Sequence, residues 1–174
     1  MKAKSTNLLL TGPPGVGKTT LIRKFCDALA PVRPAGFYTQ EIRRAGVRRG
    51  FELVSLDGRR GVLAHVDERG PARVGKYGVD VAGFERFLEV IDFFGERYQI
   101  IIVDEIGKME CFSPKFRTLL GQLLDSEKPL VATIALKGGG IIEQTKSRSD
   151  VTLVNITRRN RDGLLSELIN SLRK

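Results

Sequence analysis

The stretch Gly12-Pro13-Pro14-Gly15-Val16-Gly17-Lys18-Thr19 decides which fold this chain can adopt. It matches the pattern G-x-x-x-x-G-K-[ST], which is typical of loops that hold nucleotide phosphates. Leu8–Thr11 before it has the composition of a buried strand, and Thr20–Leu29 after it that of a helix, so the motif has the strand–loop–helix setting it requires. Its glycines let successive backbone N–H groups point inward at phosphate oxygens, and the following helix adds its positive N-terminal end.

The loop itself supplies the predicted contacts to a nucleotide. Lys18 is expected to reach the β and γ phosphates and to act as a catalytic residue, while the Thr19 hydroxyl is expected to bind Mg²⁺. The residues predicted to surround the phosphates are Gly12, Pro13, Pro14, Gly15, Val16, Gly17, Lys18, Thr19 and Thr20.

A second motif lies at Gln99–Glu105, where a β-branched run ends in two carboxylates. Such a run is typical of a central parallel strand, and ligands bind beyond the carboxyl ends of these strands. Asp104 is therefore predicted to hold Mg²⁺, directly or through water. Because side chains alternate along a strand, Glu105 should face another side of the pocket, where it can orient a water and accept its proton. The alternative is that a buried strand simply ends in an acidic turn.

Composition limits the class of protein. A chain of 174 residues, 41% hydrophobic and 28% charged, fits one globular domain over residues 1–174. It has no apolar run long enough for a membrane span and no apolar leader at its start, so we expect no membrane partner. Cys26 and Cys111 lie far apart and suit a reducing, cytoplasmic setting with buried or inert thiols.

The net charge of +9 attracts polyanions, including nucleotides and nucleic acids. The basic residues are nevertheless scattered over separate segments, so a nucleic-acid partner is possible but not required by the sequence. The oligomeric state stays open.

Alternation of strand-like and helix-like segments predicts an α/β fold. We expect a three-layer P-loop NTPase architecture with a RecA-like, mostly parallel sheet and an antiparallel hairpin excursion around the turn Asp57-Gly58. The extra strands between the two motifs are taken to separate the acidic strand from the phosphate-loop strand. The expected strands are 6–11, 36–42, 47–56, 61–66, 99–105, 130–135 and 151–155, and the expected helices are 18–29, 80–96, 114–124, 141–147 and 164–172.

Several stretches together resemble one family, the nucleoside-triphosphatases of the thermophile THEP type, whose animal member is called cancer-related nucleoside-triphosphatase. They are Thr11–Leu21 (TGPPGVGKTTL), Gly36–Arg43 (GFYTQEIR), Gly50-Phe51, Leu56–Gly58, Val74–Asp80 (VGKYGVD), Val103–Glu110 (VDEIGKME) and Asn155–Asp162 (NITRRNRD). The resemblance covers nearly the whole chain in order. It implies a RecA-like P-loop fold and Mg²⁺-dependent hydrolysis of several NTPs to NDP and phosphate.

Other residues admit two interpretations each. Lys108 could approach phosphate or pair with Glu110. Arg158, Arg159 and Arg161 could clamp the base, act as an arginine finger, or lie in a solvated loop before the last helix. Asn160 is a candidate helix cap.

The stretch Arg43–Arg49 is either a flap over the nucleotide or an exposed basic turn. His65 is taken as structural.

The predicted activity is hydrolysis of nucleoside triphosphates with loose base selectivity, because the recognisable contacts all go to phosphates and Mg²⁺. One rival is a nucleotide or small-molecule kinase, which uses the same loop and passes phosphate to an acceptor. Another is a nucleic-acid-linked ATPase, suggested by the positive charge.

Overall fold

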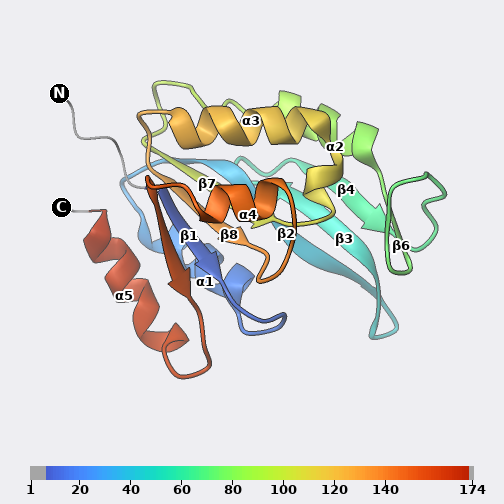
Figure 1. Ribbon diagram of the computed structural model, residues 1–174, viewed down its shortest axis with the longest axis horizontal. Helices are drawn as coiled ribbons and strands as arrows, with labels where there is room; N and C mark the ends of the chain where they lie inside the picture. The colour runs from blue at the N-terminus through green and yellow to red at the C-terminus, as the bar shows by residue number, and fades with distance from the viewer. Residues whose placement is uncertain (1–6, 173–174) are drawn as a thin grey trace.

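The computed structural model describes residues 7–172, and in this part of the chain nine strands form one sheet (Figure 1). In spatial order the strands are β5 (Arg73–Val74), β6 (Tyr77–Val79), β4 (Arg60–His65), β3 (Val47–Ser55), β2 (Pro34–Arg44), β7 (Ile100–Ile106), β8 (Leu130–Ile134), β1 (Asn7–Thr11) and β9 (Val151–Asn155). The sheet has a parallel half and an antiparallel half that meet at β2. The parallel half contains β2, β7, β8, β1 and β9. The antiparallel half contains β2, β3, β4, β6 and β5.

The position of β8 between β1 and β7 confirms the RecA-like arrangement. The sequence-based expectation of which strands separate β1 from β7 was wrong, however. The segments between the two motifs form the antiparallel half of the sheet, and the separating strand comes later in the chain than the acidic strand.

Strand β2 belongs to both halves of the sheet. It pairs in parallel with β7 only over Pro34–Phe37, whereas its antiparallel pairing with β3 runs on to Arg44. The hairpin of β2 and β3 therefore extends beyond the edge where the parallel strands end, which is also the edge that carries the phosphate loop.

Helices cover both faces of the sheet (Figure 1). Helices α1 (Lys18–Ala28) and α5 (Arg161–Ser171) pack on one face, where Leu21 and Leu164 share a core with Leu10 of β1. Helices α2 (Val81–Glu89), α3 (Pro114–Asp125) and α4 (Ile141–Lys146), with the 3₁₀ turn η1 (Glu110–Phe112), pack on the other. The three layers match the predicted architecture. Among residues 7–172, no helix combines the length and apolarity needed to cross a bilayer.

Local signals explain most element boundaries. The Ser113 hydroxyl accepts a hydrogen bond from the Phe116 N–H at 2.9 Å, which caps α3 at the start of the helix expected over 114–124. Gly36 is required by a close approach, because a Cβ there would lie 1.8 Å from the Ile102 carbonyl oxygen and its φ is 139°. It lets β2 pair with β7.

Two predictions of secondary structure were wrong. The helix expected over 80–96 ends at Glu89, because the chain then turns and buries the Phe93 side chain in the core. The short hairpin of β5 and β6 was missed, since its strands are only two and three residues long. Residue 6 of the first predicted strand lies outside the described residues.

Candidate functional site

The phosphate loop has the backbone shape that its glycines permit. Gly15 and Gly17 have φ values of 75° and 107°, a region that side chains with a Cβ rarely adopt. Lys18 is the first residue of α1, and its Nζ donates hydrogen bonds to the carbonyl oxygens of Gly12 at 2.9 Å and Pro13 at 3.3 Å. The ammonium thus lies across the loop at the N-terminal end of a helix, where negative charge is favoured.

Asp104 lies at the end of β7 and is fully buried. Its Oδ2 accepts a hydrogen bond from the Thr19 hydroxyl at 2.8 Å, and its Oδ1 accepts one from the Thr133 hydroxyl of β8 at 2.5 Å. Burial raises the pKa of the Asp104 carboxyl, and the hydrogen bonds from Thr133 and Thr19 oppose that increase. The inserted strand β8 therefore supplies a donor that orients the acidic residue toward the phosphate loop.

Glu105 points elsewhere, as expected. Glu105 lines a cavity of ≈ 590 Å³ beside the phosphate loop, together with Lys18 and Thr19. Asp104, in contrast, is fully buried and does not line this cavity. Burial, and next the charge of Asp104, raise the pKa of the Glu105 carboxyl. A carboxylate with a raised pKa is better suited to accept a proton near neutral pH.

Glu110 is a site residue that the sequence reasoning did not recognise. It is 5% exposed, and a Cβ placed on Gly107 would lie 2.9 Å from the Glu110 Oε2 and 3.1 Å from the Glu105 Oε1. The two carboxyl groups therefore flank the same glycine. Burial and the charge of Glu105 raise the pKa of Glu110 well above its ordinary value.

Of the two interpretations of Lys108, the ion pair with Glu110 is not formed among the described residues, and the approach to phosphate stays a prediction. The Lys108 side chain is exposed and does not line the cavity. Glu110 could have been recognised as a site residue from its place six residues after Asp104, because the 3₁₀ turn η1 folds this stretch back onto β7.

The far wall of the cavity comes from the β2–β3 hairpin, whose tip is the stretch interpreted above as a flap or a basic turn. It consists of Thr39, Gln40 and Glu41 of β2 with Arg48 and Phe51 of β3. Within the stretch interpreted as a flap or a basic turn, Arg43 is exposed and pairs with Glu41 at 2.6 Å, whereas Arg48 faces the cavity. Arg43 therefore fits the exposed basic turn, and a flap over the nucleotide stays a prediction that the place of Arg48 in the cavity lining is compatible with.

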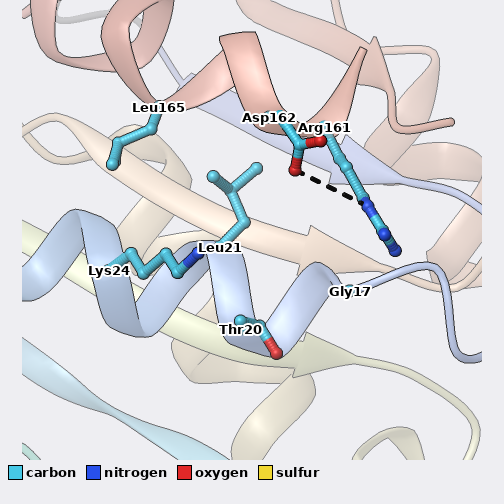
Figure 2. Close-up of a pocket in the computed structure, with 7 residues that line it drawn as sticks. All are labelled: Gly17, Thr20, Leu21, Lys24, Arg161, Asp162 and Leu165. Atoms are coloured by element: carbon cyan, nitrogen blue, oxygen red, sulfur yellow. Dashed lines mark ion pairs between the residues drawn. The ribbon is translucent and has the colours of Figure 1, made fainter. Parts of the chain in front are cut away.

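A second cavity, of ≈ 400 Å³, lies on the other side of the loop between α1 and α5 (Figure 2). Arg161 extends toward Gly17 and donates to the Val16 carbonyl oxygen at 3.3 Å, and its Nε lies 3.7 Å from the Asp162 carboxylate. The lining residues are Gly17, Thr20, Leu21, Lys24, Arg161, Asp162 and Leu165. Because Gly17 and Thr20 border both cavities, a nucleotide can extend from one into the other across the loop.

The three arginines near the last strand separate in the structure. Arg158 and Arg159 are exposed and line neither cavity, while Arg161 lines the cavity between α1 and α5. Asn160 precedes α5 but does not cap it through its side chain. Its Oδ1 accepts from the Thr157 N–H and its Nδ2 donates to the Asn155 carbonyl oxygen, so it braces the preceding loop instead.

The oxygen groups near the loop fit a hard divalent cation. Thr19 and Asp104 present a hydroxyl and a carboxylate 2.8 Å apart, which are ligand types that Mg²⁺ accepts. Within residues 7–172, no group of three or more His, Cys, Asp or Glu side chains could hold a metal alone. An ion here would complete its coordination with water and substrate phosphates, as Mg²⁺ commonly does.

The inserted strand, the glycine-rich loop and the buried carboxylate beside the loop threonine define a P-loop NTPase of the RecA-like class. The chain belongs to the family described as NTPase, whose sequence model matches residues 7–169.

Named relatives agree with that assignment. The chain is 44% identical to "Nucleoside-triphosphatase THEP1" of Thermotoga petrophila, over 95% of this chain and 92% of that protein. It is 39% identical to "Cancer-related nucleoside-triphosphatase" of Homo sapiens, over 94% of each chain. The crystal structure of THEP1 from Aquifex aeolicus superposes with a TM-score of 0.84 at 34% identity, covering 97% of this chain and 99% of that one.

Proposed function

We propose that this protein is an Mg²⁺-dependent nucleoside-triphosphatase that hydrolyses ATP, GTP and other NTPs to NDP and phosphate. The observation that carries the proposal is that Lys18, Thr19 and Glu105 line one cavity beside the phosphate loop, while the buried Asp104 accepts a hydrogen bond from the Thr19 hydroxyl. The names of the relatives support the activity, because each is called a nucleoside-triphosphatase.

Each residue has a role that its position suggests. The backbone N–H groups from Gly15 to Thr19 and the Lys18 ammonium bind the phosphate oxygens and offset the charge that develops on them. Glu105 orients a water for in-line attack on the γ phosphate and accepts its proton. Asp104 and Thr19 would hold Mg²⁺, which supplies charge neutralisation on the phosphates when bound.

Loose base selectivity follows from the second cavity. The polar side chains offered to a base there are Lys24, Arg161 and Asp162, which are long or exposed and can adapt to different base edges. Because recognition is concentrated on the phosphates, the enzyme should discriminate little between bases.

Cys26 and Cys111 are free thiols, which suits the cytoplasmic setting that we propose. Burial raises the pKa of each thiol to about 12, so both are poor nucleophiles.

The test is phosphate release from ATP, GTP, CTP and UTP by the purified protein, with Mg²⁺ and with EDTA. We expect release from all four nucleotides with Mg²⁺, at rates within about one order of magnitude, and loss of release with EDTA. Release from one nucleotide alone would contradict the loose selectivity, and release in EDTA would contradict the metal dependence. RNA or DNA added at several salt concentrations separates the nucleic-acid-linked alternative, because stimulation of that kind falls steeply with salt.

A further inference from the structure

The cavity at Glu105 is much larger than hydrolysis requires. A water molecule occupies about 30 Å³ of liquid, whereas this cavity measures ≈ 590 Å³. Part of that space belongs to the β and γ phosphates at the loop. The remainder extends past Glu105 to the β2–β3 hairpin, within the size range of sites for small molecules.

The hairpin wall begins beside the phosphate loop and extends away from it across the sheet. The Thr39 N–H of β2 donates to Asp104 Oδ2 at 3.4 Å, the oxygen that the Thr19 hydroxyl also contacts, whereas Arg48 and Phe51 lie on the next strand, β3. Strand β3 is the fourth strand from β1, and neighbouring strands are about 4.8 Å apart, so their backbones are separated by roughly 19 Å across the sheet. The overhang of β2 beyond its pairing with β7 then places the wall beyond the carboxyl ends of the parallel strands. Lys18, Glu105 and Arg48 line the same cavity, so a γ phosphate on Lys18 and a molecule held at Arg48 would share it.

The wall is ordered by its own contacts. The Arg48 Nε donates to the Tyr77 hydroxyl at 3.0 Å and its Nη1 donates to the Glu41 Oε1 at 2.8 Å, which fixes the guanidinium plane. Its Cζ lies 5.3 Å from the centre of the Phe51 ring. Within residues 7–172, the Arg48 Nη2 has no hydrogen-bond partner, and the side chain is 45% exposed. This arrangement offers a fixed cationic donor beside an aromatic face, which suits an anionic group attached to a flat ring.

We propose that this wall binds a small acceptor molecule, an aromatic alcohol that carries an anionic group, and that the enzyme transfers the γ-phosphoryl group to its hydroxyl oxygen. The inference rests on the proposed nucleotide site and extends it to a second substrate. The bond between Pγ and the β,γ-bridging oxygen breaks, and a bond between Pγ and the acceptor oxygen forms. The hydroxyl proton passes to Glu105, and the bridging oxygen leaves with its electron pair on NDP.

An alcohol acceptor would use Glu105 as the attacking water does in hydrolysis. An alcohol must lose its proton as it attacks, and Glu105 is the carboxylate that lines the cavity together with Lys18 and Arg48. An acceptor whose attacking oxygen is already ionised, such as a phosphate, would not need that base. The anionic group of the alcohol is therefore assigned to Arg48 and its hydroxyl to Glu105.

Three related probes test the assignment on the whole protein with Mg²⁺ and ATP labelled in its γ phosphate. They are para-(hydroxymethyl)benzoate, which has ring, anion and alcohol, benzyl alcohol, which lacks the anion, and benzoate, which lacks the alcohol. The measurement is the ratio of labelled phosphate ester to labelled free phosphate, separated by chromatography. We expect ester from para-(hydroxymethyl)benzoate at a ratio about tenfold or more above that from benzyl alcohol, and none from benzoate.

Variants locate the effect. Arg48→Ala should lower the ester-to-phosphate ratio about tenfold or more, because a hydrogen bond to an anion is lost. Arg44→Ala is the matched control, since Arg44 is an exposed residue of the same hairpin outside the cavity lining, and the ratio should stay unchanged. Arg48→Lys repeats the test if the alanine variant does not fold, because lysine keeps the charge and loses the planar fork.

Label that appears only as free phosphate with every probe would overturn the proposal while leaving the hydrolase intact. Equal ester yields from the two alcohols, or equal ratios in the Arg48→Ala and Arg44→Ala variants, would overturn the assignment to Arg48. Absence of both ester and free phosphate would instead refute the nucleotide site itself.

Discussion

Removing the hydroxyl of Thr133 should weaken the protein although that residue touches no predicted substrate. Thr133 and Asp104 are both 0% exposed, and the hydroxyl donates to Asp104 Oδ1 at 2.5 Å. Thr133→Val preserves the shape of the side chain and removes that donor, so the main loss is one hydrogen bond to a buried carboxylate. Such a bond contributes about 1.5–3 kcal/mol.

The expected loss is measurable in the free energy of unfolding. For a chain of this length, about 1.5–3 kcal/mol corresponds to a decrease in melting temperature of roughly 3–12 °C. Urea unfolding followed by circular dichroism gives the free energy, and Thr133→Ser should restore most of it because serine retains the donor. The variant should also hydrolyse NTPs more slowly, because Asp104 Oδ2 is then held less firmly toward Thr19.

The control lies on the neighbouring strand. Thr11 of β1 is 2% exposed, and its hydroxyl has no hydrogen-bond partner among the described residues. Thr11→Val therefore removes a buried hydroxyl without removing a bond, and should leave the stability unchanged or raise it. Equal losses in the Thr133→Val and Thr11→Val variants would refute the argument, since the cost would then come from the substitution and not from the bond to Asp104.

Three further predictions concern other parts of the structure. Gly36→Ala should destabilise the protein by about 4 kcal/mol or more, seen as a lower urea midpoint, because a Cβ would lie 1.8 Å from the Ile102 carbonyl oxygen. Glu110 has a pKa raised above its value in the unfolded chain, so the free energy of unfolding of the wild-type protein should fall as pH rises from about 4.5 toward the folded pKa. The Glu110→Gln variant should show a smaller decrease between about pH 4.5 and 8. Parallel curves for the two proteins would contradict this assignment. Arg161→Ala should weaken binding of a fluorescent ATP and a fluorescent GTP by a similar factor of about two to ten, and a loss confined to one base would show that Arg161 selects bases.

The features that could be predicted from the sequence depend on short-range chemistry. The phosphate loop needs glycines at fixed spacing before Lys18 and Thr19, and the buried strand before Asp104 is a continuous β-branched run. Both signals are complete within a few residues. The strand–loop–helix order around them then determines which end of the sheet carries the site.

The features that could not be predicted depend on pairing between distant segments. Arg48 and Phe51 reach the cavity because β2 pairs with β7 over only four residues and then continues with β3, which no local pattern of charge or hydrophobicity reveals. Glu110 looked like a surface partner of Lys108, but η1 folds it into the core. Likewise, the strand that separates β1 from β7 comes from a later part of the chain.

The central claim is that Glu105 promotes attack on the γ phosphate of a nucleotide held by the loop. Its most direct test is phosphate release in a single turnover by Glu105→Gln, with the affinity for a fluorescent ATP measured on the same sample. Glutamine preserves the size of the side chain and cannot accept the proton, so the rate should fall about 10²–10⁴-fold while the affinity changes little. A rate equal to that of the wild-type protein, at unchanged affinity, would show that Glu105 has no part in the reaction.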